Sequence, residues 1–111
     1  MKDINWQEKK NKQLINAFVS VKTQKEASCF LRDLMTEGEI KEFANRLEAA
    51  LLLSNNVKYS EIIEKTKLSS TTIARISKWL KGPLGGYRLI LNKMHHTYYQ
   101  NSAGKGLSLY S

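Results

Sequence analysis

Hydroxyl and cationic side chains gather in one short segment, and their types and spacing suit recognition of a polyanion. Four consecutive hydroxyl residues occupy positions 69–72, and three cations follow at three-residue intervals. In the first turn of a helix, short hydroxyls can bond base edges or phosphates, and the helix N-terminus itself favours phosphate. A small residue at position 74 lets such a helix approach closely. The residues predicted to contact DNA are Ser69, Ser70, Thr71, Thr72, Ala74, Arg75, Lys78 and Lys81.

These residues belong to a predicted helix-turn-helix over residues 58–80, in which a first helix braces a second across a tight turn. Ser69 is a favourable N-cap for the second helix. Lys67 stands where the turn often has glycine, so it must accept a left-handed or neighbouring backbone conformation at some cost. Ile63 likewise stands where a small residue is usual. Four apolar residues have the offsets that lock the two helices together, namely Ile62, Leu68, Ile73 and Ile76.

Charge is distributed unevenly along the chain. The net charge is +8, of which residues 1–54 contribute about +1 and residues 55–111 contribute +7. No acidic residue follows Glu64, whereas eight lysines and arginines follow from Lys65 onward. A nearly neutral scaffold joined to a basic working face indicates a polyanionic partner.

Length and composition favour one small domain in a reducing compartment. Residues 1–96 are expected to form this domain, and residues 97–111 to be a flexible tail. The single cysteine, Cys29, excludes an internal disulfide and is interpreted as a small buried hydrophobic residue. The N-terminus is too polar for a signal peptide, and no apolar run approaches the ~20 residues of a membrane helix. We therefore expect a cytoplasmic protein without a membrane partner.

Hydrophobic periodicity predicts an all-α chain. Thr23 and Thr36 each precede a glutamate by three residues, which is the spacing of a capping box at a helix start. Gly82 and Pro83 form a helix stop. The expected helices span about residues 5–19, 23–34, 36–53, 58–66, 70–80 and 87–95.

The first two helices carry apolar stripes that a chain of this size does not cover by itself. A homodimer that intertwines these helices would bury the stripes, and a compact six-helix monomer is the alternative. The residues concerned are Leu14, Phe18, Phe30 and Leu34.

Residues 31–80 resemble the tryptophan repressor family. The resemblance rests on Leu34-Met-Thr-Glu-Gly-Glu-Ile, Ala44-Asn-Arg-Leu-Glu and Ser69-Ser-Thr-Thr-Ile-Ala-Arg. The next segment, Trp79-Leu-Lys-Gly-Pro-Leu-Gly-Gly-Tyr87, is similar to the YerC/YecD-type subgroup. The resemblance extends to about Met94. It implies an intertwined homodimer with six helices per subunit that acts as a transcriptional repressor.

The tryptophan site of that family is matched only in part. The resemblance implies two arginines around the corepressor, and Arg46 and Arg75 correspond to them. Ile76 replaces the glycine that follows the second arginine, and its side chain should obstruct a flat indole ring. The side chain of Trp79 is placed to fill the space that the ligand's indole would occupy. A vestigial ligand pocket is therefore predicted at Arg46, Arg75, Ile76 and Trp79. We expect no tryptophan dependence and no other cofactor, and we expect Arg46 to pair with Glu42 or another carboxylate.

Metal binding and catalysis lack the residues that they require. His95 and His96 are adjacent, so on a helix they point about 100° apart, and no second cysteine completes a zinc site. The hydroxyl residues have no histidine base that the sequence identifies. We therefore expect neither a metal ion nor enzymatic activity.

The sequence thus predicts a regulator, interpreted as a repressor, that binds a pseudo-palindromic DNA site as a homodimer through the recognition helix 70–80. One alternative is a helical protein-interaction adaptor that keeps the fold without specific DNA binding. An RNA-binding protein is disfavoured, because the RNA major groove is too narrow for side-chain reading. A plain surface hairpin with capping hydroxyls and solvated lysines is the simplest alternative. Three roles remain open for Tyr98, Tyr99 and Tyr110: a disordered tail, packing on the partner subunit, or contact with nucleic acid.

Overall fold

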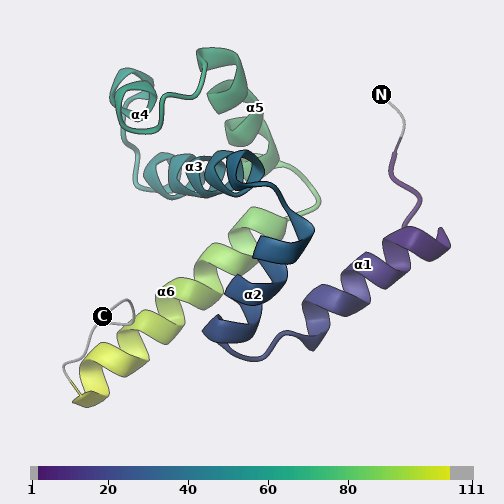
Figure 1. Ribbon diagram of the computed structural model, residues 1–111. Coiled ribbons are helices and arrows are strands. Elements are labelled where there is room, and N and C mark those ends of the chain that lie inside the picture. The colour runs from purple at the N-terminus through teal and green to yellow at the C-terminus, as the bar shows by residue number, and fades with distance from the viewer. Residues whose placement is uncertain (1–2, 106–111) are drawn as a thin grey trace. The chain divides into compact units, whose positions relative to one another are not determined.

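The computed structural model is built from α-helices joined by short turns (Figure 1). It describes the backbone of residues 3–105 and the side chains of residues 3–95, and no β-strand occurs in the described backbone. The all-α class and the order of six helices are confirmed. The helices are α1 Lys9–Ser20, α2 Gln24–Leu34, α3 Glu37–Ser54, α4 Tyr59–Thr66, α5 Ser70–Lys81 and α6 Gly86–Lys105.

The chain forms two compact units, Met1–Ile40 and Lys41–Ser111. The first unit contains α1, α2 and the start of α3. The second unit contains the rest of α3 and the helices α4, α5 and α6. A single domain over residues 1–96 stays a prediction.

Threonine–glutamate pairs precede or begin α2 and α3, as predicted. The Thr23 Oγ1 accepts a hydrogen bond from the backbone N–H of Glu26 at 3.0 Å, and the Glu26 carboxylate accepts one from the N–H of Lys22 at 3.0 Å. The second pair is reciprocal, with distances of 3.1 Å to the Thr36 Oγ1 and 2.9 Å to the Glu39 Oε1. Hydrogen bonds from the backbone and side chain of Thr36 hold the pKa of Glu39 below its usual value. Both helices start here because these bonds satisfy free backbone donors.

The helix α1 begins at Lys9, later than the predicted start near residue 5. Asn5 forms a turn before it: the Asn5 Oδ1 accepts from the N–H of Gln7 at 3.0 Å, and the Asn5 carbonyl accepts from the N–H of Glu8 at 3.1 Å. Asparagine side chains compete with helix formation in this way. Periodicity alone therefore placed the start of α1 too early.

Apolar side chains of α1 and α2 remain partly exposed, and neither helix contains a buried residue. Phe18 and Phe30 meet edge to face, with ring centroids 5.5 Å apart and ring planes at 77°. Cys29 is exposed, so its interpretation as a buried residue is wrong. The reason is that Cys29 lies one residue before Phe30 and therefore about 100° around the helix from it.

The helix α6 runs to Lys105, well beyond the predicted end near residue 95. The polar residues after Thr97 suggested a helix end, but no proline follows Pro83 to break the backbone hydrogen bonds. The predicted flexibility of residues 97–111 stays a prediction. Residues 106–111, with Tyr110, lie outside the described residues.

The core of the second unit draws residues from four helices and from the turn before α5. The helix α4 packs against α5, and α5 packs against α6. Ile62 and Ile73 are fully buried, and complete burial of such a side chain contributes about 1.5–3 kcal/mol. The inner faces predicted for α4 and α5 are thereby confirmed. The core residues are Ala49, Ala50, Ile62, Leu68, Ile73, Ile76 and Leu91.

Lys67 is the C-cap of α4, and its backbone has φ 62° and ψ 13° in the left-handed region. The N–H of Lys67 still donates to the carbonyl of Ile63 at 2.8 Å. The left-handed conformation predicted for this lysine is confirmed. It brings the β-carbon close to the following carbonyl oxygen, which costs about 1–2 kcal/mol for an L-residue.

We expect Lys67→Gly to stabilise the protein. Glycine adopts a positive φ without this steric cost, although its greater freedom in the unfolded chain offsets part of the gain. The expected net gain is about 0.5–1 kcal/mol, measured as a higher urea midpoint at an unchanged slope. The control is Lys65→Gly, which removes the same charge inside α4 and should cost about 1 kcal/mol. Equal losses in both variants would contradict a strained Lys67.

Candidate nucleic-acid interface

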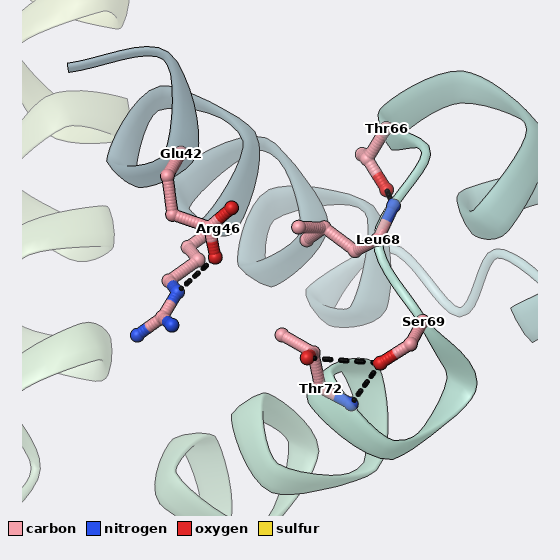
Figure 2. A network of polar contacts seen from close by, with 6 residues as sticks. All are labelled: Glu42, Arg46, Thr66, Leu68, Ser69 and Thr72. Carbon is pink, nitrogen blue, oxygen red and sulfur yellow. Dashed lines mark hydrogen bonds and ion pairs between the residues drawn. The ribbon is translucent and has the colours of Figure 1, made fainter. Parts of the chain in front are cut away.

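The turn between α4 and α5 is organised by a buried threonine. Thr66 is 2% exposed, and its Oγ1 donates to the carbonyl of Ile62 at 2.7 Å. The same oxygen accepts from the backbone N–H of Leu68 at 3.3 Å, the contact that Figure 2 shows at the turn. The Leu68 side chain is buried in the core. The hydroxyl therefore satisfies a backbone donor that the left-handed turn leaves without a helical partner.

Ser69 caps α5, as predicted. Its Oγ accepts from the backbone N–H of Thr72 at 3.1 Å and donates to the Thr72 Oγ1 at 3.0 Å (Figure 2). Ser70 and Thr71 are exposed, and neither hydroxyl has a hydrogen-bond partner among the described residues. The predicted hydroxyl cluster thus divides into a capping pair and a free pair at the start of α5.

The helix α5 presents an exposed polar face opposite its buried isoleucines. Ile73 and Ile76 point into the core. The described ion pairs join Arg46 to Glu42 and Lys65 to Glu61, and neither involves a cation of α5. The positive charge of this face is therefore not neutralised by a carboxylate within the described residues. The exposed residues of the face are Ser70, Thr71, Ala74, Arg75, Lys78 and Lys81.

Three of the residues assigned to a vestigial ligand pocket have separate surroundings. The Arg46 Nε lies 2.9 Å from the Glu42 Oε2, which confirms the predicted salt bridge (Figure 2). The Arg46 guanidinium carbon is also 5.7 Å from the centroid of the Phe43 ring. Arg75 is exposed, whereas Ile76 is buried in the core. The Arg46 charge therefore already has a carboxylate and a ring face as partners.

The fourth residue, Trp79, lines an open apolar hollow of about 540 Å³. Its side chain is 40% exposed, so the indole forms one wall of the hollow. A role for Trp79 in place of a bound ligand stays a prediction. The other lining residues are Leu47, Leu84, Gly86, Tyr87 and Ile90.

Two positioning residues were missed from the sequence. Thr66 is the last residue of a short helix before a turn. A threonine at such a position indicates a hydroxyl that bonds to the nearby backbone. In the sequence Arg88 is only one of the eight cations from Lys65 onward, yet it donates to two backbone carbonyls at the end of α5. No local pattern shows that contact, because its donor and acceptors lie on either side of a turn.

No group of three or more His, Cys, Asp and Glu side chains is placed to hold a metal ion among the described residues. Between residues 3 and 105, no helix combines the length and the apolar character that crossing a membrane requires.

Comparisons with known proteins identify the family. The family model of the Trp repressor protein matches residues 9–95, which is more than half of the chain. This chain belongs to the Trp repressor family. It is 33% identical over 91 residues to the uncharacterized protein YerC of Bacillus subtilis (strain 168), covering 82% of this chain and 88% of YerC.

A solved structure extends the comparison to the fold. The chain is similar to a TrpR-like protein from Eubacterium eligens, with a TM-score of 0.76 and 31% sequence identity. The match covers 81% of this chain and 93% of that chain. The predicted Trp-repressor-like fold and the YerC/YecD-type subgroup are confirmed.

We expect Thr66→Val to destabilise the protein, because valine keeps the shape but removes the hydroxyl. The N–H of Leu68 then loses its partner in a buried position, which costs about 1–3 kcal/mol. Urea unfolding measures the loss. The control is Thr66→Ser, which keeps the hydroxyl and should retain most of the stability. A Thr66→Val variant as stable as the wild type would show that the hydroxyl does not support the turn.

Proposed function

We propose that this protein is a DNA-binding transcriptional regulator that represses by occupying promoter DNA. It binds a pseudo-palindromic site as a homodimer and uses α5 as its recognition helix. One observation carries this proposal: the exposed face of α5 combines free hydroxyls at its start with cations that form no ion pair with a carboxylate among the described residues. Membership of the Trp repressor family supports it.

The residues of this face have distinct roles in the proposal. Ser70 and Thr71 read base edges, directly or through water, from the N-terminal turn of α5. Arg75, Lys78 and Lys81 contact phosphates and supply affinity for any sequence. Ala74 lets α5 approach the groove floor, and Ser69 and Thr72 contribute through the cap that starts the helix.

The homodimer is supported by the apolar surface of α1 and α2. Neither helix has a buried residue, and Val19 is 76% exposed. Complete burial of a large apolar side chain contributes about 1.5–3 kcal/mol, so a partner subunit that covers several of them gains substantial stability. In a two-fold dimer, the two α5 helices would lie ~34 Å apart and face successive major grooves.

The protein is proposed to act without L-tryptophan. Ile76 is buried in the core, and Arg46 is paired with Glu42. Both groups are therefore engaged within the chain itself.

The proposal is tested by selecting sites from random double-stranded DNA and measuring affinity for the selected site and for bulk DNA. At ~0.15 M salt we expect discrimination of at least ~10³. Two chains should bind each site. Weak binding that salt abolishes, without a preferred site, would instead favour a protein-interaction adaptor.

Substitutions on α5 should separate affinity from specificity. Arg75→Ala and Lys78→Ala should each weaken binding to all sequences and reduce the salt slope by about 1. Thr71→Ala should change the preferred bases and leave the salt slope unaltered. Lys93→Ala, on α6, is the control for charge. If the electrophoretic shift of DNA were unchanged in all three α5 variants, the assignment of α5 as the DNA-contacting helix would be wrong.

Calorimetry tests the proposed independence from tryptophan. We expect no saturable heat when L-tryptophan is titrated into the protein. We also expect the same DNA affinity with and without about 1 mM L-tryptophan, a concentration well above the micromolar dissociation constant of a functional site. The matched titration uses the Ile76→Gly variant, in which an opened site is expected to gain affinity if the variant remains folded. Micromolar binding by the wild type that tightens DNA affinity would overturn this part of the proposal.

A further inference from the structure

Arg88, near the start of α6, is hydrogen-bonded to the C-terminal end of α5. Its Nη1 donates to the carbonyl oxygens of Leu80 and Gly82, each at 2.8 Å. Gly82 is the C-cap of α5. The last carbonyls of a helix lack partners within it and form the negative end of its dipole. A guanidinium there makes charge-assisted bonds where a cation is most favourable.

The turn between α5 and α6 leaves room for this contact. Gly85 has φ +72°, and a β-carbon on Gly85 would lie 3.1 Å from the Arg88 Nη2. A side chain at this position would therefore strain the backbone and press on the guanidinium. Gly86 differs: a β-carbon there meets nothing within 4 Å, and its φ is not in the left-handed region.

Packing constrains the two ends of α5 unequally. Ile73 and Ile76, in its first two turns, are buried in the core. Near the other end, Trp79 is 40% exposed beside an open hollow, and Leu80 is only partly buried against the core. The bonds from Arg88 join this end to α6, whose Leu91 lies in the same core.

We propose that Arg88 is a positioning residue for DNA recognition. It holds the C-terminal end of α5 against α6 and so sets the angle at which Ser70 and Thr71 meet the bases. This inference rests on the proposed function of α5. Loss of the Arg88 contact lowers discrimination between the specific site and bulk DNA. Affinity for bulk DNA is preserved, because it depends on charge rather than on the angle of α5.

The test compares Arg88→Gln with Lys93→Gln, which removes the same charge from another exposed position of α6. Arg88→Gln should lower the ratio of specific to bulk affinity about tenfold, as expected for loss of exposed charge-assisted hydrogen bonds. Its salt slope should equal that of Lys93→Gln. Arg88→Lys, which keeps a cation near the carbonyls, should recover part of the ratio. A salt slope reduced by about 1 only in Arg88→Gln, with all sequences weakened alike, would mean that Arg88 contacts phosphate and would overturn the proposal.

A second pair of variants leaves Arg88 in place. Gly85→Ala should displace the guanidinium and lower the specificity ratio, whereas Gly86→Ala should match the wild type. Urea midpoints show whether each variant is folded. Amide hydrogen exchange at Gly82, whose N–H donates to the carbonyl of Trp79 at 3.2 Å, should become faster in Arg88→Gln and Gly85→Ala.

The outcomes separate this inference from the function on which it rests. A wild-type protein that discriminates no DNA site contradicts the proposed function, and the positioning role falls with it. A wild-type protein that discriminates its site, with Arg88→Gln exchanging faster at Gly82 but reading DNA unchanged, contradicts the positioning role alone.

Discussion

The burial of Ile62, Ile73 and Ile76 holds α4 against α5, and the candidate interface depends on that contact. When the isoleucines of α5 enter the core, helical geometry turns the residues at the intervening positions outward. The polar character of the outer face is thus a consequence of the inner face, because a helix repeats every 3.6 residues. Arg75 and Thr71 are exposed for the same reason that Ile73 is buried.

Polar groups in the turn between α4 and α5 support the apolar contact between these two helices. Lys67 adopts a left-handed conformation, which is unfavourable for any residue with a β-carbon. Thr66 and Ser69 on either side of it supply hydroxyls that satisfy backbone donors, one at Leu68 and one at Thr72. The turn therefore combines a local conformational cost with local hydrogen bonds, and the core packing on both sides determines that the balance favours folding.

Arginines of this chain have unlike roles although the sequence presents them alike. Arg46 pairs with Glu42 on its own helix, and Arg88 donates to carbonyls across a turn, while Arg75 is exposed on α5. A bound ligand is one way to stabilise the orientation of a recognition helix, and contacts within the chain are another. The buried Ile76 and the Arg88 contact are of the second kind. Together with the pairing of Arg46 to Glu42, they are the physical basis for proposing a DNA-binding regulator without a corepressor.

Local patterns predicted much of this protein. Capping boxes at Thr23 and Thr36, the N-cap at Ser69 and the core positions of α5 involve residues at most a few positions apart, so their geometry follows from helical spacing. The family could likewise be recognised from residue motifs. Only the tertiary structure showed that Arg88 reaches the end of α5, because that contact depends on the path of the turn at Gly82 and Gly85.

The difference between local patterns and tertiary contacts also explains which predictions from the sequence were wrong. Periodicity placed the start of α1 too early because it does not register the competing Asn5 turn, and it gave no signal that α6 continues to Lys105. Proximity to apolar neighbours suggested that Cys29 is buried, but the side of α2 on which it lies is exposed. The sequence by itself determined the helices, the recognition motif and the sign of its charge, because these are local properties. The tertiary structure decided that Arg88 binds the carbonyls at the end of α5, because that contact depends on groups that folding brings together.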